Sequence, residues 1–318
     1  MVHLRIVAPR EHAHAALGLL EASGSVINVI HLHDVARKPD GDVILCDVAR
    51  EDASVVIGDL KQLGIHRDGT IAVELVDTAI SHAADRAERH APGSPADAVI
   101  WEEVTERTSE ESAISATYLV FIVLAALIGS VGIYLNSAIL IVGAMVVGPE
   151  FGPIAGVCVA AVQRRPGLAG RSLVALAVGF PLAIAAVVLT SLIFKATDIT
   201  PDAFSSASHS LSETIANPDF FAAFVAFCAG VAGMLSLTTA KSGALIGVLI
   251  SVTTIPAAAN VGVSAAYADW DSFGGSIGQL GLNIASLLAA GIITLSIQRA
   301  LFNRRRAAHE ARRAAAPS

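Results

Sequence analysis

The stretch GAMVVGPEFGPI, residues Gly143–Ile154, decides how the rest of this chain is interpreted. It lies inside an apolar run, residues 137–162, that is long enough to cross a bilayer. Pro149 and Pro153 interrupt the run, and we predict a broken helix there because proline lacks a backbone donor and clashes with the preceding turn. Glu150, between them, is the only charged residue of the run. A carboxylate inside a membrane costs roughly 2.5–3.5 kcal/mol on insertion scales, which makes Glu150 a candidate functional residue.

The composition favours a membrane protein with a soluble part. Hydrophobic residues make up 54% of the chain and charged residues 15%. The charges concentrate in residues 1–111 and in the C-terminal tail, so the net charge of −7 belongs to the soluble parts and argues against a nucleic-acid partner. The three cysteines have no paired spacing, and no cleavable signal peptide is expected, since a strand pattern starts at Val2.

Residues 1–80 have the pattern of a small soluble α+β domain. Val2, Leu4 and Ile6 alternate with polar residues, which indicates a half-buried strand. Two amphipathic helices and three more strands are predicted at residues 9–23, 25–35, 42–48, 51–63 and 71–75. The order βαββαβ predicts a ferredoxin-like fold. It resembles regulatory domains that sense small ligands, so a small regulatory ligand is a candidate partner, and oligomerisation through the sheet is expected.

Eight of the ten histidines lie in residues 1–90. His31 and His33 are two residues apart on a predicted strand and therefore share a face, and His3 could lie on a neighbouring strand. One interpretation is a metal site or a pH sensor. The other is a solvated sheet face rich in histidine. The sequence leaves the metal undecided, and no other cofactor is expected. Cys46 is expected to be a packed core thiol.

Residues 81–113 are predicted to be a helical connector. Its second helix carries five glutamates, Glu102, Glu103, Glu106, Glu110 and Glu111. A helix this acidic is not expected to lie on an anionic lipid surface. Two alternatives remain: the helix packs on its own domain or a neighbouring subunit, or it is a solvated spacer.

Six segments of residues 114–298 are long and apolar enough to span a bilayer. They are residues 114–135, 137–162, 172–194, 220–240, 242–268 and 276–298. The loop after the second segment and the tail, residues 299–318, are basic, whereas the loops at 195–219 and 269–271 are acidic. Six crossings put both basic stretches on one side of the membrane. By the positive-inside rule we predict a multi-pass protein of the inner cell membrane, with both termini cytoplasmic.

The second three segments repeat the pattern of the first three. The fifth segment has its own interior proline, Pro256, preceded by Thr253 and Thr254 and followed by Asn260. Because three crossings separate the halves, the halves run in opposite directions. The expected membrane domain is therefore all-α, an inverted 3+3 repeat with two broken helices, which is an architecture that many secondary transporters use.

Three motifs also carry a resemblance to a known family. The start Asn136-Ser137-Ala138, the stretch GAMVVGPEFGPI and the stretch TIPAAANVG at Thr254–Gly262 resemble bacterial and archaeal membrane proteins that are known only by an uncharacterised hydrophobic domain, a domain of unknown function. The resemblance covers roughly residues 114–298 and implies a membrane fold but no substrate. Glu150 departs from the pattern, because many members have a non-acidic residue there. A role for this carboxylate is therefore not expected to hold for the whole family.

The two breaks define the predicted site. A broken helix presents carbonyl groups at the end of one half and N–H groups at the start of the other, and these can bind a cation or an anion. Glu150 favours a cation or a proton, with Thr253, Thr254 and Asn260 as neutral ligands. Gly148, Pro149, Pro153 and Pro256 would shape the site. The alternative is structural: Glu150 pairs with a polar group, and the prolines are simple kinks.

We predict a secondary transporter of an ion or small solute, modulated by the cytoplasmic domain. A passive ion channel could use the same breaks, and a membrane-anchored ligand sensor without transport is the alternative from another class. An enzyme is not expected, because no predicted span has a histidine or a nucleophile motif. The expected partners are the lipid bilayer, the transported ion or solute and further copies of the chain in a homo-oligomer.

Overall fold

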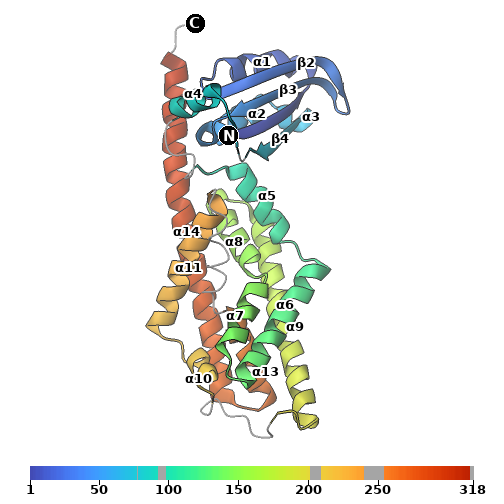
Figure 1. Ribbon diagram of the computed structural model, residues 1–318, viewed down its shortest axis with the longest axis vertical. Helices are drawn as coiled ribbons and strands as arrows, with labels where there is room; N and C mark the ends of the chain where they lie inside the picture. Colours follow the sequence, from blue (N-terminus) through green and yellow to red (C-terminus); the bar gives the residue numbers. More distant parts are fainter. Residues whose placement is uncertain (77, 92–97, 201–208, 240–253, 316–318) are drawn as a thin grey trace. The chain divides into compact units, whose positions relative to one another are not determined.

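The computed structural model describes residues 1–76, 78–91, 98–200, 209–239 and 254–315. The chain divides into two compact units, one built mainly from Met1–Val104 and the other mainly from residues 105–304. Figure 1 follows the elements of each unit along the chain.

The N-terminal unit contains a four-stranded antiparallel sheet. Its elements follow the order β1 (Val2–Ala8), α1 (Arg10–Glu21), β2 (Val26–Arg37), β3 (Asp40–Val48), α2 (Arg50–Gln62), α3 (Ile65–Asp68) and β4 (Thr70–Leu75). The strands lie side by side in the order β2-β3-β1-β4, and each neighbouring pair is antiparallel. The predicted succession of strands and helices is therefore the observed one, with the short helix α3 added.

One face of this sheet carries the core of the N-terminal unit. Val2, Leu4 and Ile6 of β1 are fully buried, as their alternation predicts. They pack in one cluster with the apolar sides of α1 and α2, which include Leu20 and Leu60. Cys46 on β3 belongs to the same cluster, so the prediction of a packed thiol is confirmed, and burial raises the pKa of this thiol to about 12.

Two further helices follow the sheet, α4 (His82–His90) and α5 (Trp101–Glu111). The first residues of α5 pack on α2. Ser54 Oγ accepts from the backbone N–H of Trp101 at 3.0 Å and donates to Glu102 at 2.8 Å, and Lys61 forms a 3.0 Å ion pair with Glu102. The start of this acidic helix therefore packs on its own domain, whereas Glu106, Glu110 and Glu111 are exposed.

The second unit is helical. Its described elements are α6 (Ala116–Tyr134), α7 (Ala138–Val147), α8 (Phe151–Gln163), α9 (Pro166–Ala196), α10 (Ser210–Ala216), α11 (Phe220–Thr238), α13 (Thr254–Ala266) and α14 (Trp270–Ala315). Among the described residues, α6, α9, α11 and α14 are each long and apolar enough to cross a membrane, and the bent pair α7–α8 makes up to five spans. Most of the amino-terminal half of the predicted fifth span lies outside the described residues, so the expected total of six is not tested.

The predicted break in the second span is confirmed. Helices α7 and α8 are bent by 51° at residues 148–150. Pro149 disfavours the helical conformation for the residue before it, and Gly148 is extended, with φ −64° and ψ 127°. Pro153, the second of the two prolines that were expected to interrupt the run, does not itself break the helix. Helix α8 starts at Phe151 and includes Pro153 in its first turn, where a missing N–H removes no intrahelical bond.

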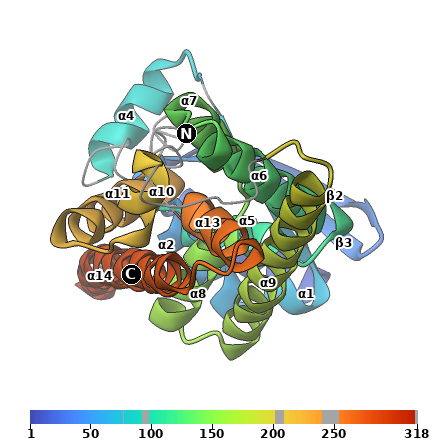
Figure 2. The same ribbon diagram turned by 90° about the horizontal axis from the view of Figure 1, so that it is seen from below.

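Helix α13 is the centre of the helical unit. Every residue from Thr254 to Ser264 is buried, and α13 contacts α6, α7, α9 and α10 (Figure 2). Small residues allow this close approach. A Cβ added at Gly262 would lie 2.6 Å from Cβ of Val187 on α9. The apolar stretch TIPAAANVG is therefore a packing surface on several sides.

We expect Gly262→Ala to destabilise the helical unit by roughly 1–3 kcal/mol, because the new methyl group meets the stiff β-branched side chain of Val187. The matched control is Gly170→Ala on α9, where an added Cβ meets nothing within 4 Å. That variant should be neutral or stabilised by up to about 1 kcal/mol. Thermal unfolding midpoints of the two variants in detergent check this prediction, and equal midpoints would contradict it.

Candidate ion site at the helix break

Glu150 is buried at the break between α7 and α8. Glu150 is only 2% exposed. One carboxylate oxygen, Oε1, accepts a hydrogen bond of 2.6 Å from Thr254 Oγ1, at the start of the described part of α13. The other oxygen, Oε2, is buried and has no hydrogen-bond partner among the described residues. Burying a polar atom without a hydrogen-bond partner costs free energy, so this oxygen is the atom at which a bound proton or ion is most expected.

The local sequence holds the carboxylate at this place. Pro149 ends α7, and Glu150 directly precedes α8 with its backbone carbonyl accepting from the N–H of Ile154 at 3.2 Å. Gly148 supplies the space. A Cβ added at Gly148 would collide with Glu150 Oε2 and would lie 2.6 Å from Cγ1 of Ile255. Glycine at position 148 therefore lets the carboxylate lie back against the break.

The arrangement can hold a proton or a cation. The end of α7 leaves backbone carbonyls without intrahelical partners, and the first turn of α8 leaves N–H groups in the same state. Glu150 Oε2 adds an acceptor that is free to bind a proton or to ligate an ion. The hydroxyl of Thr254 is committed to Oε1 as a donor, but its oxygen keeps acceptor capacity.

The structure brings some of the predicted site residues together and separates others. Glu150, Gly148 and Thr254 meet at the break. Pro149 and Pro153 flank Glu150 on either side in the chain, and Pro256 lies in the first turn of α13. Thr253 lies outside the described residues.

Asn260 lies in a different polar contact. It accepts from Ser212 Oγ at 2.7 Å and donates to Ser276 Oγ at 2.8 Å, so it joins α10, α13 and α14. Asn260 is six positions after Thr254 on α13, which corresponds to about 9 Å along the helix axis and about 1.7 turns. The expected grouping of Asn260 with Glu150 is therefore not observed. Ser212 and Ser276 belong to no sequence motif, and only the folding of the chain brings them to Asn260.

The three histidines that the sequence suggests as metal ligands lie in two separate places. His3 on β1 bonds to Asp47 on β3, with 2.8 Å between Nδ1 and Oδ1. His31 and His33 on β2 instead converge on Asp42, at 2.7 Å and 3.2 Å from its Oδ2. His3 is thus not a partner of His31 and His33. Asp42, which no sequence pattern singles out, completes a group whose ligand atoms all lie within 4.8 Å of one another.

Asp42 is an unusually acidic carboxyl group. Its side chain is 4% exposed, and burial by itself raises its pKa. Hydrogen bonds from His31, from the backbone N–H of Asp34 at 2.9 Å and from His33 outweigh burial and lower the pKa to about 2. Asp42 is therefore ionised throughout the physiological range.

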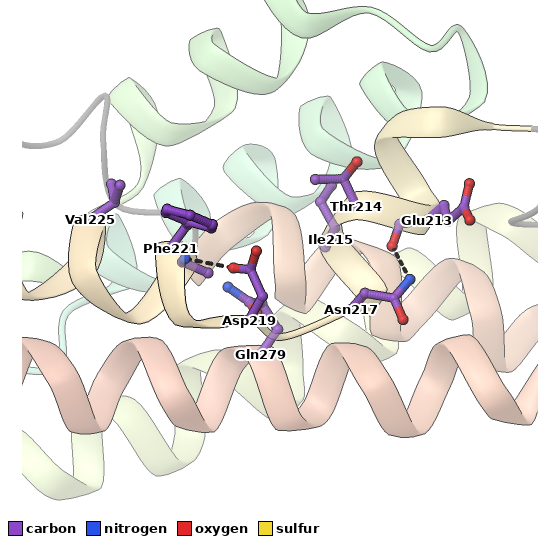
Figure 3. Close-up of a pocket in the computed structure, with 9 residues that line it drawn as sticks. Glu213, Thr214, Ile215, Asn217, Asp219, Phe221, Val225 and Gln279 are labelled. Atoms are coloured by element: carbon purple, nitrogen blue, oxygen red, sulfur yellow. Dashed lines mark hydrogen bonds between the residues drawn. The ribbon is translucent and has the colours of Figure 1, made fainter.

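A pocket of about 580 Å³ lies between α10, the start of α11 and α14 (Figure 3). Its lining includes Glu213, Asp219, Phe221 and Gln279. Asp219 Oδ1 caps α11 by accepting from the N–H of Ala222 at 2.7 Å. Gln279 Nε2 donates to Asn283 at 3.1 Å, whereas its Oε1 is buried with no partner among the described residues. Part of the predicted acidic loop therefore borders a hollow at one end of these helices.

The fold and the broken helix indicate the class of protein to which the chain belongs. The described part has an N-terminal antiparallel sheet of four strands and several long apolar helices, which are compatible with a multi-pass membrane protein. A family model described as a domain of unknown function, DUF389, matches residues 145–289, slightly less than half of the chain. This match confirms the resemblance to an uncharacterised domain family and includes both Glu150 and Thr254. Comparison with curated proteins and with solved structures gave no match.

Replacement of Thr254 by Val tests the buried hydrogen bond. Thr254→Val keeps the shape but removes the donor to Glu150 Oε1, so neither carboxylate oxygen would have a hydrogen-bond partner among the described residues. We expect a loss of roughly 1–3 kcal/mol in stability. Thr254→Ser keeps the hydroxyl and should retain most of it. Thermal midpoints in detergent distinguish the two variants, and equal losses would show that the hydroxyl contributes nothing.

Acid titration tests the Asp42 cluster. Because the pKa of Asp42 is lowered from about 3.8 to about 2 in the folded chain, its contribution to stability is complete above pH 3.8 and disappears as the pH falls towards 2. Asp42→Asn should therefore reduce amide hydrogen-exchange protection of β2 and β3 near neutral pH, by roughly 1.5–3 kcal/mol. The difference from the unsubstituted protein should shrink between pH 4 and pH 2. A difference independent of pH would contradict this assignment.

Proposed function

We propose that this protein is a secondary transporter of an ion or small solute, coupled to a proton or cation through Glu150. The observation that carries the proposal is the buried Glu150 carboxylate, with one oxygen unpartnered among the described residues, at a break between two apolar helices. Irregular backbone inside a membrane is tolerated only where protein buries it or where it lines a polar cavity. Ionisable residues at such depth mark ion and proton pathways.

The contact between the two halves of the helical unit supports this proposal. Glu150 belongs to the first predicted set of three spans, and Thr254 belongs to the second. In transporters built from inverted repeats, the two broken helices meet at the substrate site. The proposal therefore includes the full six-span inverted 3+3 repeat, with Pro256 marking the second break.

The remaining features complete the proposed arrangement. The strand order β2-β3-β1-β4 supports a ferredoxin-like N-terminal domain, which would regulate transport by binding a small ligand. The basic loop containing Arg164 and Arg165 favours an inner-membrane location with cytoplasmic termini. A homo-oligomer is proposed because small residues line several helices and favour association between copies.

Flux measurements in proteoliposomes test the transport role. The purified protein would be screened with a pH-sensitive dye inside the vesicles, under imposed gradients of Na⁺, K⁺, Cl⁻ and protons. Glu150→Gln keeps the size of the side chain but removes the charge and the exchangeable carboxyl proton. We expect coupled flux in this variant to fall by on the order of tenfold or more.

The matched control is Glu106→Gln, the same chemical change at an exposed position of α5. Its flux should equal that of the unsubstituted protein. Unaltered flux in Glu150→Gln would refute the role of Glu150. If the unsubstituted protein carries ions only down their own gradient, without coupling, it is a channel. If it carries no flux at all, the result favours a sensor.

A further inference from the structure

We propose that His31, His33 and Asp42 form a binding site for a divalent transition-metal ion in the N-terminal unit, with two imidazoles and one carboxylate as ligands. The site is independent of the proposed transport function. It lies at the end of the β2–β3 hairpin, far in sequence from Glu150.

The hairpin builds the site through an irregularity in its pairing. His31 is paired with Ile44, and the register shifts between Leu32 and Ala36. Asp34, inside this shifted segment, has a positive φ of 57°. Bulges of this kind redirect side chains. Here the shifted segment brings both His33 and the backbone N–H of Asp34 to the carboxylate of Asp42.

The distances suit a small metal ion. The nitrogens of His31 and His33 lie 2.7 Å and 3.2 Å from the same Asp42 oxygen, and the three ligand atoms lie within 4.8 Å of one another. In a tetrahedral zinc site with bonds of about 2.0–2.1 Å, ligand atoms are about 3.3 Å apart. The hydrogen-bonded cluster therefore needs shifts of only a few tenths of an ångström to about one ångström to enclose an ion.

The carboxylate has the support that metal ligands have in known sites. Asp42 Oδ2 points to the histidines, while Oδ1 accepts from the N–H of Asp34 at 2.9 Å. Arg10 in turn binds the side chain of Asp34, with 3.0 Å from Nε to Oδ1. Such outer contacts fix the orientation of ligating groups.

Burial distinguishes this cluster from a solvated sheet face. The Asp42 side chain is 4% exposed, whereas His31 and His33 are 33% and 78% exposed. The buried Asp42 carboxylate would supply a negatively charged ligand, and the accessible imidazoles of His31 and His33 let an ion reach it from solvent. Two imidazoles and a carboxylate suit Zn²⁺, Co²⁺ and Ni²⁺ rather than Mg²⁺, and leave a further coordination position for water or another ligand.

The test uses the full-length protein in detergent, without a polyhistidine tag and stripped of metal. Calorimetric titration with ZnCl₂ should give one saturable ion per chain, and Co²⁺ should produce visible absorption bands of a site with nitrogen and oxygen ligands. MgCl₂ should give no comparable binding. Absence of saturable Zn²⁺ binding overturns the proposal.

Three single substitutions assign the ion to this cluster. His31→Ala and His33→Ala should each weaken Zn²⁺ binding by on the order of tenfold or more. His33 is the more decisive position, because its exposed side chain contributes little to the core. His3→Ala is the matched control, since His3 makes a similar bond to Asp47 on the same sheet but shares it with no second histidine of the described chain. Its Zn²⁺ affinity should be unchanged. Equal affinity in all three variants overturns the assignment, and thermal midpoints verify that each variant is folded.

Discussion

The helical unit depends on how the carboxylate of Glu150 is accommodated away from water. A charged or polar group in apolar surroundings is tolerated only with compensating contacts. Here one contact comes from Thr254, and the space comes from Gly148. These two residues lie on different segments, so the break between α7 and α8 is tied to the position of α13. The central helix and the broken helix therefore constrain each other.

The same dependence explains the composition of α13. A helix that is buried from Thr254 to Ser264 must present a small surface to each neighbour, and its alanines and Gly262 meet this requirement. Two of its polar residues bind specific partners: Thr254 binds Glu150, and Asn260 binds Ser212 and Ser276. The bonds of Thr254 and Asn260 each hold a neighbouring element, which makes α13 a point of attachment for the start of α8, for α10 and for α14.

Local chemistry made parts of this structure predictable. Alternation identified β1, and proline identified the break at residues 148–150, because both effects act within a few residues. The pairing of Glu150 with Thr254 was expected only as a general meeting of two breaks. The partners of Asn260 were not predictable, since Ser212 and Ser276 are ordinary residues that long-range packing brings to it. The spacing of His31 and His33 marks them as a pair, but nothing in the sequence marks Asp42 as their partner, because the register shift in the hairpin leaves no trace in residue spacing.

Gly148 has a consequence for how this site can change over evolutionary time. The space that a side chain at position 148 would need is filled by the end of the Glu150 side chain and by Ile255. A larger residue at 148 therefore requires both the end of the Glu150 side chain and Ile255 to move. A shorter residue at 150 would remove one of these two obstacles, and Ile255 would remain as the other. Space at the break therefore couples three positions, 148, 150 and 255, and a change of size at one of them constrains the other two.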